Sequence, residues 1–147
     1  MKKVEDILRN RNASGVYVLA ADIHHGKIAK VCEELGHAYF LVRGEAVSTK
    51  ANLLEAISRT LQFPSYFGAN WDALEDCLTD MSWVKADSYV IVCDSVGFFA
   101  GRHPHEFETI LSIFKDTAEF WKSRGVGFYV LLAGGGVEMS GLSVLEW

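Results

Sequence analysis

Three things are scarce in this sequence: cysteine, long apolar runs and, over one stretch, positive charge. The cysteines at 32, 77 and 93 are odd in number and form no CxxC motif, so they indicate neither a disulfide framework nor a zinc site. All three lie in apolar periodic segments, as small core residues do. No apolar run approaches the length of a membrane span, and acids at 5 and 6 stand where a signal peptide would have its apolar run. We therefore expect a reducing, cytoplasmic setting.

The composition is that of a folded globular protein. The chain has 147 residues, of which 50% are hydrophobic and 22% charged, enough for a domain with its own core. Neither an internal repeat nor an interior linker divides it, so we expect a single domain over residues 1–147. The formal net charge of −5 argues against direct contact with nucleic acid, which requires clustered Lys and Arg. A basic protein is the more natural partner.

Runs of β-forming residues alternate with segments of helical periodicity along the chain. The predicted strands are 15–20, 38–42, 89–93 and 128–132. The predicted helices are 4–9, 28–35, 49–61, 70–81 and 107–121, with loops at 10–15 and 94–104. Thr49 is a suitable N-cap for the third of these helices, and Gly36 stands where a glycine would end the second. This order predicts an α/β fold with a small, mainly parallel sheet flanked by helices.

The end of the chain leaves two alternatives open. Three glycines at 134–136 are typical of a flexible break. The tail that follows is either disordered or docks on the core through Leu142, Val144 and Trp147.

The stretch 63–81 is the most informative part of the sequence. It opens as an aromatic loop with Gly and Pro, and Asn70 is a suitable N-cap for the helix that follows. At helical spacing one stripe is apolar: Trp71, Leu74, Leu78 and Met81. A neighbouring stripe is acidic: Asp72, Glu75, Asp76 and Asp80. No Lys or Arg occurs from 60 to 84, so we expect a helix that buries one side and presents unneutralised carboxylates on another.

This acidic stripe has two interpretations. Like charges four residues apart destabilise a helix by a few tenths of a kcal/mol, and the positive helix N-terminus offsets this mainly for Asp72. A surface that tolerates such repulsion is suited to a strongly positive partner. It is equally typical of the solvated face of an acidic protein, and charge spacing alone leaves both open.

Residues 64–79 read Pro-Ser-Tyr-Phe-Gly-Ala-Asn-Trp-Asp-Ala-Leu-Glu-Asp-Cys-Leu-Thr. This pattern closely resembles that of the barstar family, intracellular inhibitors of the secreted bacterial ribonuclease barnase. The order of predicted elements from 38 to 132 is also similar to the barstar fold: strand, helix, acidic helix, strand, helix, strand. Residues 1–37 then form an N-terminal addition with an extra strand and helix, and 133–147 form a C-terminal tail.

The resemblance implies a stoichiometric inhibitor that plugs a nuclease active site with a helix and its preceding loop, and not an enzyme. The positions that match partner-contacting residues of the family are Tyr66, Asn70, Asp72, Asp76, Thr79 and, on a later helix, Asp116. Trp71 and Glu75, where the family has leucine and tryptophan, complete the expected surface. Asp80 and Met81 depart too, standing for glycine and tryptophan. Because of these departures, the resemblance does not identify barnase itself as the target of this chain.

Other constellations point to different chemistry. His24 and His25, or His103 and His105 with Glu106, could be metal ligands, but neither group has helical spacing or an obvious third ligand. Three acids of the stretch 72–76 could bind magnesium for a hydrolase, but no nucleophile or base stands beside them. Ser95 lacks a G-x-S-x-G setting, and the triple glycine lacks the lysine of a P-loop. We therefore expect no catalytic residue, no metal and no cofactor.

The expected partner is a basic ribonuclease or a related toxin, bound by a monomer without nucleic acid or membrane. Tyr66, beside the acidic stripe, is expected to be a partly exposed anchor of the kind that interfaces use, although it could be a core residue. The alternative function is an interaction domain of the same fold that binds a basic partner other than a nuclease.

Overall fold

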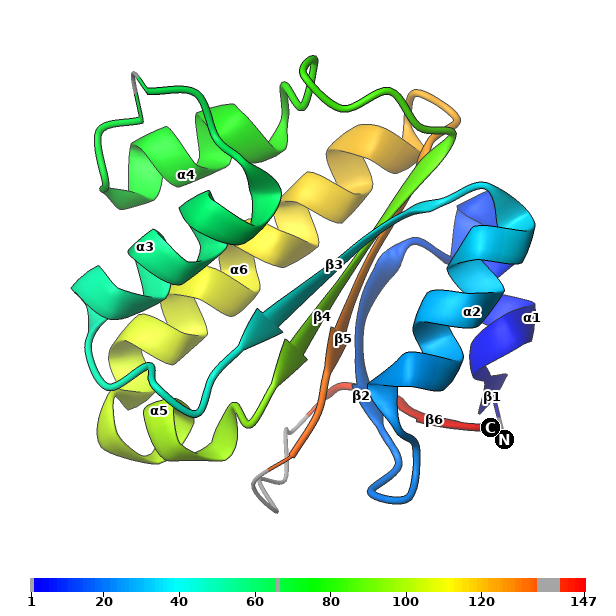
Figure 1. Ribbon diagram of the computed structural model, residues 1–147, viewed down its shortest axis with the longest axis horizontal. Helices are drawn as coiled ribbons and strands as arrows, with labels where there is room; N and C mark the ends of the chain where they lie inside the picture. Colours follow the sequence, from blue (N-terminus) through cyan, green and yellow to red (C-terminus); the bar gives the residue numbers. More distant parts are fainter. Residues whose placement is uncertain (1, 66, 135–140) are drawn as a thin grey trace.

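The computed structural model describes residues 2–65, 67–134 and 141–147 (Figure 1). Six strands form one sheet in the order β1-β6-β2-β5-β4-β3, and all neighbouring pairs run parallel. The strands are β1 (Lys2–Lys3), β2 (Gly15–Leu19), β3 (Ala38–Arg43), β4 (Ser88–Asp94), β5 (Gly127–Leu132) and β6 (Val144–Glu146). The helices are α1 (Val4–Leu8), α2 (His25–Leu35), α3 (Lys50–Leu61), α4 (Trp71–Leu78), α5 (Gly97–Arg102) and α6 (Pro104–Lys122), with a 3-10 turn η1 (Arg11–Ala13). The predicted α/β fold is confirmed.

Helices cover both faces of the sheet. In Figure 1, α3, α4, α5 and α6 lie on one side of the strands, and α1 and α2 lie on the other. Successive residues of β4 serve the two sides in turn: Ile91 packs into the core beneath α3, α4 and α6, whereas Val90 and Val92 pack beneath α1 and α2. Because alternate residues of a strand face opposite ways, a strand buried on both faces has to be apolar throughout.

Two helix boundaries predicted from capping residues are confirmed. Thr49 accepts a hydrogen bond from the Asn52 amide at 3.1 Å and begins α3. Gly36, with a φ of 75°, ends α2 in the left-handed conformation that glycine adopts without strain.

The predicted loop at 94–104 is wrong in part, because residues Gly97–Arg102 form α5. Six residues with a glycine near each end give no helical period in the sequence. The helix is held instead by burial of Phe99 and Ala100, which are 4% and 8% exposed. Pro104 then begins α6 at its first position, where its missing N–H costs nothing.

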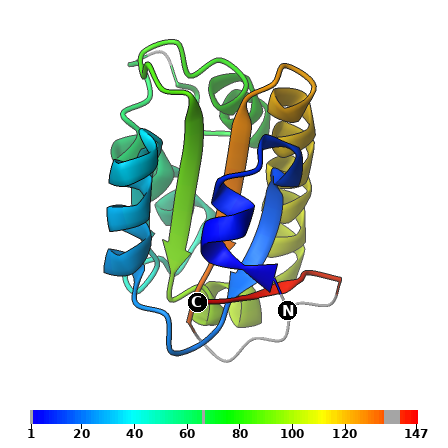
Figure 2. The ribbon, with the colours of Figure 1, turned by 90° about the vertical axis from the view of Figure 1, so that its right-hand side faces the viewer.

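The C-terminal tail docks on the sheet, which decides between the two alternatives that the sequence left open. The strand β6 lies between β1 and β2, with Leu145 paired to Lys2 and Leu19 and fully buried. Of the residues named for docking, Leu142 packs against the core, whereas Val144 and Trp147 are 48% and 42% exposed. Figure 2 shows β6 running beside β1 at one end of the sheet, where both termini lie.

Neither β1 nor β6 was predicted, because strands of two and three residues are too short to show a period. Part of the predicted glycine break, 135–136, lies outside the described residues. Among the described residues no helix is both long and apolar enough to cross a lipid bilayer.

Candidate partner-binding surface

The helix α4 begins where the sequence predicts. The side-chain oxygen of Asn70 accepts a hydrogen bond from the Ala73 amide at 2.8 Å, which satisfies one of the free donors of the first turn. The Asn70 amide group also reaches the Gly68 carbonyl at 3.4 Å. Asn70 is exposed, so it caps the helix and lies on its surface at once.

The inner side of α4 is firmly attached to the core. Leu74 and Leu78 are fully buried, and Cys77 is 3% exposed. The indole N–H of Trp121 on α6 donates to the Leu78 carbonyl at 2.8 Å. An indole therefore occupies one of the carbonyls that a helix C-terminus leaves without a partner, and it ties α4 to α6.

The prediction that the helix continues to Met81 is wrong at its end. The helix stops at Leu78, and the Thr79 hydroxyl donates to the Glu75 carbonyl at 2.8 Å. Met81 then takes a left-handed φ of 51° and buries its side chain completely. Beyond the end of α4 the backbone turns so that the Met81 side chain packs into the core. Asp80 therefore lies beyond α4 and not on its last turn.

All four predicted carboxylates are exposed: Asp72, Glu75 and Asp76 on α4, and Asp80 in the turn behind it. The described part of the chain contains two ion pairs, Arg9–Glu5 and Arg59–Glu55. Neither involves these acids. Their charges are therefore not neutralised by a cation of the described residues, as the absence of Lys and Arg from 60 to 84 predicted.

The negative charge of these acids affects the buried thiol of Cys77. Burial raises the pKa of Cys77, and the negative charges of Asp80 and Asp76 raise it further. Both carboxylates disfavour a second anion nearby, as close like charges do. The carboxylates of Asp76 and Asp80 thus act on the same buried thiol at the end of α4.

A cation that the sequence analysis missed lies at the other end of α4. The ammonium group of Lys50, the first residue of α3, stands 4.7 Å from the centre of the Trp71 ring, within the range of a cation–π contact. Trp71 is half-buried and packs against the core. One signal in the sequence could have indicated Lys50. A lysine at a helix N-terminus interacts unfavourably with the helix dipole, so its presence there indicates a compensating contact elsewhere.

The loop before α4 is held by aromatic side chains. Phe63 contacts the Phe67 ring edge-on at 5.1 Å between centroids and the Trp83 ring at 5.8 Å. The indole N–H of Trp83 donates to the Leu61 carbonyl at 2.9 Å and so caps the end of α3. Phe67 is therefore a packing residue. Tyr66, the predicted anchor, lies outside the described residues.

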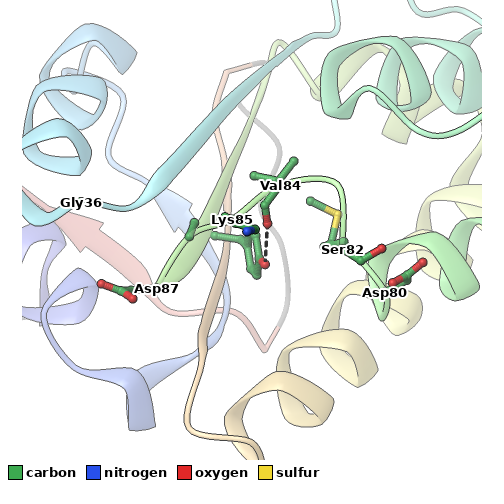
Figure 3. A pocket seen from close by; sticks show the side chains of 9 residues that line it. Gly36, Asp80, Ser82, Val84, Lys85 and Asp87 are labelled. Atoms are coloured by element: carbon green, nitrogen blue, oxygen red, sulfur yellow. Dashed lines mark hydrogen bonds between the residues drawn. The ribbon is translucent and has the colours of Figure 1, made fainter.

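An open hollow of about 610 Å³ continues the surface past the end of α4 (Figure 3). Asp80 and Ser82 line it on the α4 side, and Asp87 lies toward Gly36. Lys85 is the cation in its lining, and the Tyr89 hydroxyl donates to the Val84 carbonyl at 3.2 Å within it. No motif of the sequence indicated this hollow.

Asp116 is exposed on α6, a helix that packs against α4. Among the described residues no hydrogen bond or ion pair links Asp116 to the acids of α4. In the same part of the chain, no group of three or more His, Cys, Asp or Glu side chains is placed to hold a metal ion. The surface can therefore offer negative charge and hydrogen bonds to a partner.

A family model described as Barstar (barnase inhibitor) matches residues 37–133 of the chain. The matched part runs from the residue before β3 to the residue after β5. It contains every residue of the predicted partner-binding surface.

Proposed function

This chain belongs to the barstar family, and on that premise we propose that it is a stoichiometric protein inhibitor of a basic ribonuclease or a related toxin. The helix α4 and the loop before it enter the active site of the partner. The chain acts by occupying that site and is not itself an enzyme. The partner-binding residues of the proposal are Tyr66, Asn70, Trp71, Asp72, Glu75, Asp76, Thr79 and Asp116.

The observation that carries the proposal is the set of exposed carboxylates that form no ion pair with any described residue, on a helix fixed at both ends. A ribonuclease site needs cations to hold phosphate. Carboxylates on a rigid helix can occupy such positions and offer no phosphodiester bond to cleave. Because α4 is already ordered by the Asn70 cap and the Trp121 hydrogen bond, binding does not need to order it.

Electrostatic attraction also suits the kinetics of inhibition. Opposite fields raise association rate constants up to about 10⁸–10⁹ M⁻¹s⁻¹ at low salt. A cell that makes a nuclease needs capture before RNA is cut. Lys50 is the exception on this surface, and its position over Trp71 would repel a partner whose cations approach the start of α4, which restricts how a basic partner can dock.

The test is a pull-down with this chain as bait from lysate and medium of its source. The control bait is the triple variant Asp72→Asn, Glu75→Gln, Asp76→Asn, which keeps shape and removes charge. We expect the native bait to capture a basic protein that cleaves RNA, and an equimolar amount of the chain to stop that cleavage. The association rate should fall steeply as salt rises, because screening shortens the reach of the field.

Equal capture by both baits, or an association rate independent of salt, would contradict the role of the acidic surface. Capture of a basic protein without nuclease activity would favour the alternative, an interaction domain with another basic partner. Cleavage of RNA by the purified chain alone with added magnesium would contradict the proposal that it is not an enzyme.

We also propose that the chain works as a cytoplasmic monomer of one domain. Its three cysteines are free and buried, which is compatible with a reducing compartment. Residues of the N-terminal addition, Ile28 and Cys32, share a core with Val90 and Val92 of β4. One unfolding transition and a monomer mass in sedimentation would support this proposal, and two separate transitions would contradict it.

A further inference from the structure

The two edges of the sheet differ in how they are protected. At one edge, β1 has two residues, both lysines and both exposed. Short length and lysine are the ordinary means by which proteins prevent an edge strand from pairing with another chain. At the other edge, β3 has six residues, Ala-Tyr-Phe-Leu-Val-Arg, and only its last residue is charged. The β3 edge lacks the protection that the β1 edge has.

A groove of about 420 Å³ lies beside the carboxyl-terminal half of the β3 edge. Leu41 and Arg43 of β3 line it, together with the following residues 45–47. The other wall is one stripe of α3 with spacing i, i+3, i+4, i+7 and i+8: Asn52, Glu55, Ala56, Arg59 and Thr60. The carboxyl-terminal half of β3 thus borders a recess that is also lined by α3 and by the loop that follows β3, and Figure 1 shows β3 and α3 side by side.

The charges of this groove differ from those of α4. Its lining contains two arginines and two glutamates, so it is balanced overall. Glu55 and Arg59 face each other at 3.5 Å. Arg43 is exposed and forms no ion pair with any described residue. Glu45 is likewise exposed and forms no ion pair with a described residue, so Arg43 at the carboxyl end of β3 and Glu45 beyond it are the two charges of the groove available to a ligand.

We propose that this groove binds an extended segment of another protein, which adds to the sheet as a seventh strand beside β3. Backbone N–H and C=O groups of a free edge recognise an extended backbone, and flanking walls select alternate side chains. The segment has small or apolar residues facing Leu41 and Ala56 and a carboxylate near Arg43, since opposite charges across neighbouring strands attract.

The recess argues for a single segment and against a second copy of this chain. Paired strands lie about 4.8 Å apart. Pairing of two copies through β3 would bring α3 and residues 45–47 of both copies to the shared edge, whereas an isolated extended segment brings no second set of walls. A single extended strand can enter. This site is separate from the acidic surface of α4, so the inference does not depend on the proposed function.

The experiment selects short random peptides displayed on phage against the intact chain, and then measures the selected peptides with purified variants. Ala56→Arg fills the groove, and Thr60→Trp fills it from the same stripe. Ala51→Arg is the matched control, because Ala51 is exposed on α3 but does not line the groove. The thermal midpoint of each variant shows whether it is folded.

We expect Ala56→Arg and Thr60→Trp to abolish peptide binding and Ala51→Arg to leave it unchanged. N-methylation of alternate backbone nitrogens of the peptide should abolish binding in one register, because a methylated amide cannot donate to β3. Arg43→Glu should weaken the binding of peptides that carry a carboxylate near residue 43. It should strengthen the binding of peptides with Lys in place of that carboxylate. The proposal would be overturned if the selected peptides still bound both groove-filling variants, or if they still bound after methylation in each of the two registers in turn. A selection that enriches no peptide would also overturn it. A dimer in sedimentation that Ala56→Arg dissociates would overturn it in favour of a second copy.

Discussion

The helices α2 and α4 lie on opposite faces of the same sheet, and they are attached in the same way. Both are amphipathic and both begin at a residue whose side chain caps the first turn, His24 for α2 and Asn70 for α4. Each buries two aliphatic residues and one cysteine: Ile28, Val31 and Cys32 for α2, and Leu74, Cys77 and Leu78 for α4. Their inner sides are chemically alike.

Their outer sides are not alike. The exposed charges of α2 are mixed, with Lys27 and Lys30 followed by Glu33 and Glu34. Those of α4 are all acidic. The inner stripe decides where a helix attaches, because burial of apolar area drives packing whatever the helix presents to water. The outer stripe decides what the helix can meet. A balanced stripe is sufficient for solubility, whereas a stripe of one sign also suits a partner of the opposite sign.

The largest effect that tests this comparison is on partner binding. Asp76→Ala should weaken binding to the captured partner by about 2–5 kcal/mol or more, mostly through faster dissociation, because buried cations of the partner lose their counter-charge. The matched variant on α2, Glu33→Ala, should leave binding unchanged. The measurement is surface plasmon resonance with both variants.

The free energy of unfolding should change little for Asp76→Ala, or rise slightly as repulsion with Asp72 and Asp80 is relieved. Unchanged affinity would mean that the acidic side of α4 is only solvated. A large loss of stability would mean that Asp76 has a structural role, and the difference between the two helices would lose its functional meaning.

The second test concerns the inner sides, which should behave alike. Leu74 on α4 and Ile28 on α2 are both fully buried. Leu74→Ala and Ile28→Ala should each lower the free energy of unfolding by about 2–5 kcal/mol, through lost burial and the cavity left behind. Denaturant unfolding measures both. A loss below about 1 kcal/mol for one of them would show that its helix is loosely attached, since that value is far below the usual range.

The third test separates the two roles of Asn70. Asn70→Ala should lower the free energy of unfolding by about 1 kcal/mol, because the Ala73 amide loses its acceptor. Asn70→Ser retains a capping oxygen and should restore most of that stability. If Asn70 also contacts the partner, the serine variant should restore stability but not affinity. Full recovery of both would confine Asn70 to capping.

The smallest effect is on the two helix cysteines. Burial raises the pKa of Cys32 on α2 to about 12, whereas the pKa of Cys77 on α4 is raised by burial and also by Asp80 and Asp76. The double variant Asp76→Asn, Asp80→Asn should therefore lower the pKa of Cys77 and leave that of Cys32 unchanged. The pH dependence of thiol alkylation, followed for each cysteine by mass spectrometry, measures this. A parallel shift of both would mean that the acids do not act locally.

The same thiols make stability depend on alkaline pH. Because the folded-state pKa of Cys32 lies above the value of about 8.5 for a free thiol, the folded chain keeps a proton that the unfolded chain releases. The stabilising contribution is complete below the unfolded pKa and is lost as pH rises toward about 12. Cys32→Ala should make the unfolding free energy less dependent on pH in this range, and an unaltered dependence would contradict the assignment.

Local patterns were sufficient to predict much of this fold and of the candidate surface. A strand buried on both faces must be apolar throughout, so β4 and β5 were visible as continuous apolar runs. Helices need caps, so Thr49, Gly36 and Asn70 marked boundaries that the structure confirms. The absence of cations from 60 to 84 predicted carboxylates without ion partners on α4.

What only the tertiary structure decided depends on segments that are far apart in the sequence. The strand of Leu145 forms only between β1 and β2, and its side chain is buried in the core beneath α1 and α2. The helix α5 is held by the burial of Phe99 and Ala100 rather than by a helical period. The helix α4 stops at Leu78 because Met81 has a core position to fill and Trp121 supplies a hydrogen-bond donor from another helix. Lys50 reaches Trp71 across 21 positions of sequence. Periodicity and caps record how a segment satisfies its own backbone and faces, whereas these contacts exist only once the sheet has brought distant segments together.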